Sequence, residues 1–336
     1  MHQPRVSMLL IAYRQPDTIA RAIRAALAQT YSPLEIIASD DASDDATFAA
    51  MQAALAGYQG PHRIVLNRNP TNLGIGAHLS HLVGLSSGEL LFVTAGDDVS
   101  LPQRCATVVQ AWLAHDRQPD LIGSALFDMD AGGGMHATIM PSDLQQYRSI
   151  ADWLADPPFV VGAAQAWTRR LFDRFGPLPA GVVAEDLIMV FRAIAVASLD
   201  AGAAGGAGGA ITLPEALVGY GRGGLSRRVR NLRAQDVVER VLKNNRHALI
   251  EHEQLLRDAA SVGQLAVVQA AFDAKLRRER FIRDVFAGPG RGRKMAVALR
   301  AAGVPIGLRL RMLCYAALPG LYAPFFFVKR LLARRD

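Results

Sequence analysis

Cysteine, lysine and aromatic residues are scarce in this chain of 336 residues. Its two cysteines, Cys105 and Cys314, form no CxxC or other metal-ligand spacing, which excludes a disulfide scaffold and favours a reducing compartment. Only four of the 37 basic residues are Lys, a bias more typical of genomic composition than of function. Disorder is excluded too, because 51% of the residues are hydrophobic, enough for one large α/β domain, with or without an appendage.

Long hydrophobic runs are also missing. The first apolar run is too short for a signal-peptide core and no small-residue cleavage site follows it, so it predicts a buried strand. The uncharged stretch of 17 residues at 312–328 is interrupted by Pro319 and Pro324, whereas a membrane-spanning helix needs about 20 apolar residues. Basic residues flank this stretch, which favours an interfacial or re-entrant anchor over a span. The alternative is a C-terminal helix packed on the domain.

Basic residues are scarce in the first two thirds of the chain and concentrated in the last third. Residues 1–225 have 14 Arg and 21 Asp plus Glu, whereas residues 226–336 have 23 Lys plus Arg and 9 acids. Residues 291–336 alone have a net charge of +9. This basic tail lacks the interleaved aromatic residues and the recognisable module that a nucleic-acid-binding protein has. We therefore expect its partner to be an anionic membrane surface and not nucleic acid. The prediction is a cytoplasmic protein, peripheral on the inner face of the plasma membrane.

Strand and helix patterns alternate through the first hundred residues. Asp17 is the expected N-cap of the first helix. Alternation at this pitch predicts an α/β fold with a doubly wound, mostly parallel sheet and helices on both faces. After residue 120 the sequence predicts short strands, helices near 169–175 and over 185–197, a flexible low-complexity insertion at 201–210 and charged helices over 228–284. The strands expected first are 6–13, 34–39, 63–66 and 89–94, and the helices between them are 17–30, 44–55 and 75–85.

Two acidic clusters directly follow predicted strands. One begins at Asp40 and Asp41, and the other is Asp97 with Asp98. Because ligands bind beyond the carboxyl ends of parallel strands, both clusters are expected to converge on one crevice. Such carboxylates either cap the following helices or pair with Arg, or they hold a hard divalent cation, which prefers oxygen ligands. The residues alone leave both interpretations open.

A series of short motifs runs in a fixed order from residue 5 to residue 226. They are SMLLIAY (7–13), ALAQTY (26–31), EIIASDDASD (35–44), NLG (72–74), SSGE (86–89), AGDD (95–98) and LP (101–102), then FDRFG (172–176), AED (184–186) with Arg192, and LPE (213–215) with Tyr220 and Ser226. Their order and spacing resemble the family 2 glycosyltransferases. Each motif is weak alone, but the combination is specific.

The resemblance implies a GT-A fold, a nucleotide-diphosphate sugar donor and a Mg²⁺ or Mn²⁺ ion. By position, Ala12, Tyr13 and Asp41 would hold the nucleotide base. Asp97 and Asp98 match the DxD-type element, which meets the ribose and the metal. Ala95 stands where many members have an acid, so the expected metal site rests on Asp97 and Asp98.

The same resemblance implies inversion at the anomeric carbon. Asp186 would be the general base for the acceptor hydroxyl, with Glu185 beside it, and Arg222 would reach the diphosphate. A single displacement needs one such carboxylate on the face opposite the leaving group, and a metal with a cation stabilises the departing diphosphate. The alternative for Glu185 and Asp186 is ordinary N-capping of the helix that follows. The closing motif at 220–226 is shorter than usual and lacks the frequent His.

The sequence therefore predicts an inverting glycosyltransferase that uses a hydroxyl of a glycan or lipid-linked acceptor in cell-surface polysaccharide synthesis. Two alternatives stay open, namely sugar transfer to polyprenyl phosphate and a non-catalytic module that binds nucleotide or glycan. The expected domains are a GT-A domain at 1–226, with a nucleotide-sugar half to about 102 and an acceptor half after it, a charged helical region at 227–290 and a membrane-surface anchor at 291–336.

Overall fold

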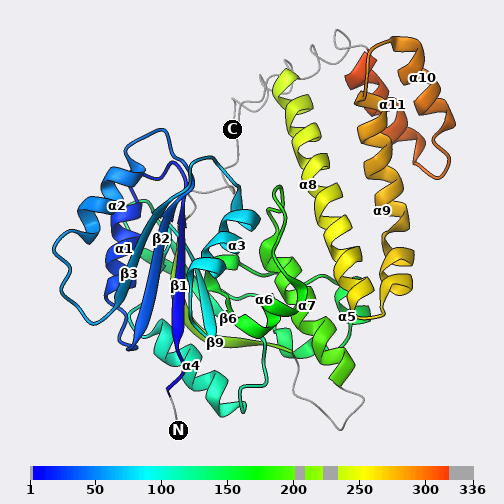
Figure 1. Cartoon of the computed structure of the whole chain (residues 1–336). Helices are drawn as coiled ribbons and strands as arrows, with labels where there is room; N and C mark the ends of the chain where they lie inside the picture. Colours follow the sequence, from blue (N-terminus) through cyan, green and yellow to red (C-terminus); the bar gives the residue numbers. More distant parts are fainter. Residues whose placement is uncertain (1–2, 201–208, 222–233, 318–336) are drawn as a thin grey trace. The chain divides into compact units, whose positions relative to one another are not determined.

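The structure is a computed structural model that describes residues 3–200, 209–221 and 234–317. The chain divides into two compact units. One comprises Met1–Arg227 with Asp258–Gln264, and the other comprises Arg228–Arg257 with Leu265–Asp336. The first unit contains all the strands among the described residues, and the second consists of helices (Figure 1).

One mixed sheet forms the centre of the first unit. Its strand order is β3-β2-β1-β4-β8-β6-β9-β5, and β7 pairs with β6. The predicted parallel arrangement is confirmed for β3, β2, β1 and β4, whereas β8 runs antiparallel to both β4 and β6. The strands are β1 (Val6–Ala12), β2 (Leu34–Asp40), β3 (Arg63–Arg68), β4 (Leu90–Ala95), β5 (Val99–Ser100), β6 (Leu121–Met129), β7 (Met135–Ile139), β8 (Ala166–Thr168) and β9 (Ala210–Gly221).

Helices cover both faces of this sheet, as predicted. Val6, Met8 and Leu10 of β1 alternate toward one face, where they join a buried cluster with residues of α1, α2 and α4. On the other face α3 contacts β1 and β2. The helices of this unit are α1 (Ile19–Leu27), α2 (Thr47–Leu55), α3 (Ile75–Leu85), α4 (Arg104–Ala114), α5 (Ile150–Ala155), α6 (Arg169–Phe175) and α7 (Glu185–Asp200), with 3₁₀ turns at Leu144–Gln146 and Gly162–Ala164.

Four further helices follow along the chain: α8 (Ala234–Ser261), α9 (Leu265–Phe286), α10 (Arg291–Arg300) and α11 (Ile306–Ala317). Asn245 of α8 donates a hydrogen bond to the Glu279 carbonyl oxygen of α9 at 2.8 Å. The last three helices share a small apolar core, formed by Phe281, Ile282, Val285, Ala298, Val304, Leu308 and Met312.

One local prediction is wrong. The first helix is capped at Thr18, without a side-chain cap, and not at Asp17. The carbonyl oxygen of Gln15 instead accepts the N–H groups of Thr18 and Ile19, so the turn is held by backbone and not by a carboxylate. Residues 201–208 of the low-complexity stretch expected over 201–210 and the end of the apolar run, 318–328, lie outside the described residues. The stretch ends in a strand, because Ala210 begins β9. The described start of that run packs in α11, with Met312 buried.

Candidate functional site

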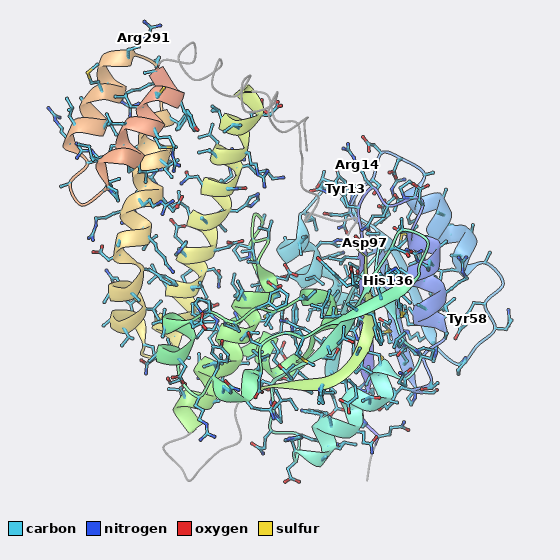
Figure 2. All side chains as sticks on the ribbon, turned by 180° about the vertical axis from the view of Figure 1, so that it is seen from behind. Tyr13, Arg14, Tyr58, Asp97, His136 and Arg291 are labelled. Atoms are coloured by element: carbon cyan, nitrogen blue, oxygen red, sulfur yellow. The ribbon has the colours of Figure 1, made fainter. Side chains whose placement is uncertain are left out.

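The carboxyl ends of β1, β2 and β4 meet at one edge of the sheet, as the acidic clusters predicted. The N–H of Asp41 donates to the carbonyl oxygen of Ala12 at 2.9 Å, and the N–H of Gly96 donates to that of Ile11 at 2.9 Å. The loops after these three strands are therefore tied together. Tyr13, Arg14 and Asp97 are labelled at this edge in Figure 2.

Asp97 and Asp98 lie in the tight turn between β4 and β5, and both are buried. Gln15 Nε2 donates to Asp97 Oδ1 at 2.9 Å, and the N–H of Gly221 donates to Asp98 Oδ1 at 2.7 Å. Within the described residues, these are the hydrogen bonds that other residues donate to the two carboxyl groups. These two hydrogen bonds orient the carboxyl groups within the turn.

The electrostatics of this pair fit a hard cation. Burial raises the pKa of Asp97, and burial together with the neighbouring Asp97 raises the pKa of Asp98 to about 8. Two adjacent carboxylates that resist ionisation gain most from a divalent ion, and oxygen donors are what Mg²⁺ and Mn²⁺ prefer. No group of three or more His, Cys, Asp or Glu side chains arranged to hold a metal occurs among the residues the structure describes. A divalent ion at this turn would therefore need further ligands besides Asp97 and Asp98.

Two glycines let the backbone close around this pair. A Cβ on Gly221, at the end of β9, would lie 2.3 Å from the carbonyl oxygen of Asp97, and a Cβ on Gly96 would lie 2.5 Å from Gln15 Oε1. At Gly221 the obstructing atom is backbone and cannot rotate aside, whereas at Gly96 it is the end of the Gln15 side chain, which would have to shift. Gly221 is therefore required where β9 passes the acidic turn.

Gln15 is a site residue that the sequence analysis missed. Its N–H donates to Thr47 Oγ1 at 2.8 Å, while its side chain joins the loop after β1 to Asp97. Its Oε1 accepts the N–H of Tyr13 at 3.4 Å. A lone glutamine in a polar loop has no pattern that would single it out, because its role depends on β4 lying beside β1.

The residues expected to hold the base differ in accessibility. Tyr13 is 42% exposed, whereas Ala12 is buried. Arg14 follows with a positive φ of 53° and lies over the Tyr13 ring, 5.2 Å from its centroid. The Arg14 guanidinium binds both oxygens of Asp44, at 2.7 and 2.6 Å, and this hydrogen-bonded pairing lowers the pKa of that carboxyl group. Tyr13 is thus presented at the surface beside an ion pair.

Asp41 organises the loop after β3. Its Oδ1 accepts Asn69 Nδ2 at 2.8 Å and the N–H of Leu73 at 2.9 Å, and its Oδ2 accepts the N–H of Gly74 at 2.9 Å. The carboxylate is 3% exposed. Asp41 therefore serves its own chain through both oxygens, and any contact with a nucleotide base adds to that structural role.

Glu185 and Asp186 form the first turn of α7, where the helix dipole favours negative charge. Asp186 Oδ1 accepts the N–H of the next residue, Leu187, at 2.8 Å, whereas an N-cap side chain accepts the N–H of a residue two or three positions further on. A Cβ on Gly162 would lie 2.6 Å from Glu185 Oε1. The N–H of Gly76 donates to the carbonyl oxygen of Val182, so the start of α3 lies against the loop that leads into α7.

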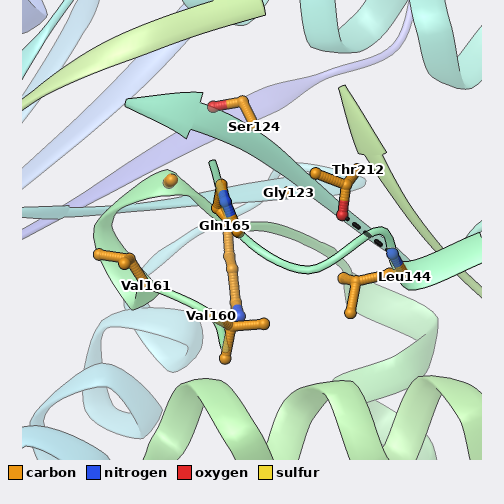
Figure 3. Close-up of a pocket in the computed structure, with 9 residues that line it drawn as sticks. Gly123, Ser124, Leu144, Val160, Val161, Gln165 and Thr212 are labelled. Carbon is orange, nitrogen blue, oxygen red and sulfur yellow. Dashed lines mark hydrogen bonds between the residues drawn. The ribbon is translucent and has the colours of Figure 1, made fainter. Parts of the chain in front are cut away.

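A small pocket lies in the same unit, lined by residues that follow β5 in the chain (Figure 3). Gln165 forms one wall, and its Nε2 donates to the carbonyl oxygen of Asp186 at 3.4 Å. Thr212 Oγ1 accepts the N–H of Leu144 at 3.2 Å in the opposite wall. The rest of the lining is mostly apolar: Gly123, Ser124, Pro141, Val160, Val161 and Ala164.

The structure brings Asp97, Asp98, Tyr13 and Asp41 to one edge of the sheet. Arg222 and the rest of the closing motif after residue 221 lie outside the described residues. His78, which the sequence places on a helix, is buried and forms a hydrogen bond with Ser39 Oγ at 2.6 Å. It therefore packs beneath the site as a structural residue.

The amino-acid sequence matches the model of a known protein family. Residues 7–173, about half of the chain, match the model described as Glycosyl transferase family 2. The chain belongs to glycosyl transferase family 2. This confirms the resemblance inferred from the motifs, and the match covers β1 through α6.

Relatives of this family 2 chain include the putative glycosyltransferase EpsE of Bacillus subtilis, 34% identical over 41% of this chain and 49% of EpsE. The succinoglycan biosynthesis protein ExoO of Rhizobium meliloti is 34% identical over 32% of this chain and 29% of ExoO. The chain therefore matches half or less of the length of these relatives.

Solved structures share the fold of this family 2 chain. The mannosyltransferase PcManGT of Pyrobaculum calidifontis, in complex with GDP-Man and Mn²⁺, has a TM-score of 0.50 and 19% identity over 96% of this chain and 88% of its own. S. aureus TarS 1-349 with UDP-GlcNAc has a TM-score of 0.52 and 15% identity over 97% and 89%. Across the described ranges, no helix has both the length and the apolar character needed to cross a bilayer.

Proposed function

We propose that this chain is an inverting glycosyltransferase. It transfers a sugar from a nucleotide-diphosphate sugar to a hydroxyl of a glycan or lipid-linked acceptor in cell-surface polysaccharide synthesis. The observation that carries the proposal is the buried Asp97–Asp98 pair at the carboxyl ends of parallel strands, in a chain of this family. The names of EpsE and ExoO support transfer in polysaccharide synthesis, and the GDP-Man and UDP-GlcNAc complexes support a nucleotide-sugar donor.

In this mechanism the donor side is built by the loops after β1, β2 and β4. Ala12, Tyr13 and Asp41 would hold the base, and Asp97 and Asp98 would hold Mg²⁺ or Mn²⁺. A divalent cation bound there offsets the negative charge that builds on the departing diphosphate. Arg222 is proposed to add a second positive charge at the diphosphate.

The acceptor side is proposed to begin at α7. Asp186, partly exposed in the first turn, removes the proton of the acceptor hydroxyl, and Glu185 lies beside it. A positioned general base contributes about 10²–10⁴-fold to the rate. Attack from the face opposite the diphosphate then inverts the anomeric carbon.

A thermal-shift panel tests the donor side. UDP, GDP, dTDP and CDP are each added with and without Mn²⁺ to the wild type and to Asp98→Ala. We expect one nucleotide to raise Tm only when both Mn²⁺ and Asp98 are present. The absence of any shift in folded wild type contradicts this proposal.

Transfer assays with Asp186→Asn then separate the acceptor classes. With a hydroxyl acceptor the rate falls by about 10²–10⁴-fold. A nearly intact rate indicates polyprenyl phosphate, which is already ionised and needs no strong base. Nucleotide binding without release or transfer of sugar indicates a non-catalytic module.

We also propose that α10 and α11 attach the chain to an anionic membrane surface, in keeping with a peripheral location on the inner face of the plasma membrane. Residues 291–311 contain six Lys or Arg and no acid. On α10 Met295 and Leu299 are 52% and 71% exposed, and on α11 Ile306 and Leu310 are 71% and 62% exposed. Exposed apolar side chains among basic ones are the pattern of an interfacial helix.

Vesicle co-sedimentation tests this attachment without truncation, which would expose the apolar core shared by α9, α10 and α11. We expect the wild type to bind phosphatidylglycerol vesicles and the Leu299→Glu/Ile306→Glu variant to lose binding. Val267→Glu, at an exposed position on α9, is the control and is expected to bind normally. Equal binding by all three proteins contradicts the proposal.

A further inference from the structure

Arg104, the first residue of α4, is a fully buried arginine beside the acidic turn. Its NH1 donates to Ser100 Oγ at 2.9 Å, and its NH2 donates to the carbonyl oxygens of Val93 at 3.0 Å and Gln165 at 3.2 Å. The guanidinium also lies over the Phe92 ring, 5.5 Å from its centroid. It therefore contacts β4, β5 and the segment before β8 at the same time.

The described surroundings of Arg104 contain hydrogen-bond acceptors but no ion-pair partner. Among the described residues no carboxylate lies within salt-bridge distance of its guanidinium. Burying a cation without a paired carboxylate costs folding free energy. A function that depends on the position of the cation would explain why this cost is tolerated. Burial lowers the pKa of Arg104 to about 10, and the smaller influences of Cys105 and Asp98 act in the opposite direction.

The hydrogen bonds of Arg104 lie on both sides of the turn that contains Asp97 and Asp98. Val93 is in the strand that enters the turn containing Asp97 and Asp98, and Ser100 is in the strand that leaves it. One planar guanidinium bridges both sides of that turn with donors of fixed direction, which a flexible ammonium group does not reproduce.

We propose that Arg104 is a positioning residue for the donor site, which sets the Asp97–Asp98 turn in the conformation that binds a divalent cation with a nucleotide diphosphate. This inference rests on the proposed function of the acidic pair. Groups that orient metal ligands from behind affect metal affinity or activity by about 10–100-fold when they are replaced. Arg104 acts through the turn and touches neither donor nor acceptor in this assignment.

The test compares Arg104→Lys with Arg169→Lys. Arg169 makes the same kinds of contact, with the carbonyl oxygen of Gly88 at 2.8 Å and Ser86 Oγ at 2.6 Å, but at the start of β4. Titration calorimetry measures the affinity for the nucleotide chosen by the thermal-shift panel, in Mn²⁺ and in EDTA. We expect Arg104→Lys to weaken the affinity in Mn²⁺ by about tenfold or more and to leave the affinity in EDTA unchanged. Arg169→Lys is expected to change neither.

Ser100→Ala provides a second, milder variant in case Arg104→Lys folds poorly. It removes one acceptor of the guanidinium and is expected to weaken the Mn²⁺-dependent affinity in the same direction. Equal affinities for wild type, Arg104→Lys and Ser100→Ala overturn the positioning role while the donor site stands. A wild type without Mn²⁺-dependent binding overturns both this inference and the proposed function.

Discussion

At the scale of single residues, Gln15 shows how a side chain outside every motif supports the site. Its Nε2 donates a hydrogen bond to Asp97, and its Oε1 accepts the backbone N–H of Tyr13. A carboxylate pair that binds a cation needs its oxygens aimed correctly, so a neutral donor at one oxygen orients the group without competing for the charge.

The first prediction concerns this contact. Gln15→Leu removes the hydrogen bond to Asp97 and is expected to weaken Mn²⁺-dependent nucleotide binding by about 10–100-fold. Gln146→Leu is the matched control, because Gln146 donates to Asp143 in an exposed 3₁₀ turn. Calorimetry in Mn²⁺ checks both variants, and equal losses in the two would show that the effect is not specific to Asp97.

The second prediction concerns His78 and pH. Burial lowers the pKa of His78 to about 4, whereas the pKa of a histidine in an unfolded chain is about 6.5. Between these values the unfolded state binds more protons, so stability is lost as pH falls from about 6.5 toward 4, at up to about 1.4 kcal/mol per pH unit. We expect Tm to fall less between pH 7 and pH 5 in His78→Gln than in the wild type. An equal fall in Tm between pH 7 and pH 5 in both proteins would show that groups other than His78 cause the loss of stability in acid.

At the scale of elements, the end of β9 completes the acidic turn although it lies more than a hundred residues away along the chain. The N–H of Gly221 binds Asp98, and its Cα hydrogen points at the carbonyl oxygen of Asp97, where no Cβ fits. The bulges between β6 and β9 around Ala125 set the register of this strand.

The third prediction follows from that contact. Gly221→Ala forces β9 away from the turn, because the obstructing atom is backbone and cannot rotate aside. We expect a lower Tm and weaker Mn²⁺-dependent nucleotide binding. Gly84→Ala, at an open position of α3, is the control and is expected to stabilise by up to about 1 kcal/mol. Normal binding by Gly221→Ala would show that β9 yields without moving Asp98.

At the scale of the whole molecule, the unit that contains the site includes Asp258–Gln264 from the end of α8 and the turn after it. Arg192 of α7 is fully buried and binds Asp258, with Nε to Oδ2 at 2.8 Å. Its NH1 also donates to the carbonyl oxygen of Gly176 at 3.0 Å. A residue distant in sequence thereby fixes the helix that begins with Glu185 and Asp186.

The fourth prediction tests this ion pair. Asp258→Ala leaves the Arg192 charge buried without its carboxylate and is expected to reduce the free energy of unfolding by about 3–5 kcal/mol. Asp284→Ala removes the exposed pair with Arg283, and we expect a change of less than about 1 kcal/mol. Chemical denaturation measures both, and similar small losses would contradict a structural role for Asp258.

Much of the first half of the fold could be predicted, because buried parallel strands and amphipathic helices have local periodicity. The helix expected over 75–85 begins and ends as predicted. The second helix starts at Thr47 and not at residue 44, since Asp44 binds Arg14 and Asp45 accepts the N–H of Thr47. Side chains that compete for local backbone groups move helix starts in ways that periodicity does not record.

By itself the sequence determined the family, the α/β class and the acidic residues at the ends of β2 and β4, since motif order and strand-end position are properties of a linear chain. Only the tertiary structure decided which groups surround them. Gln15, Gly221 and Arg104 acquire their roles from strands that become neighbours on folding. Burial, which is the largest cause of the shifted pKa values of Asp98 and Arg104, exists only in the folded chain.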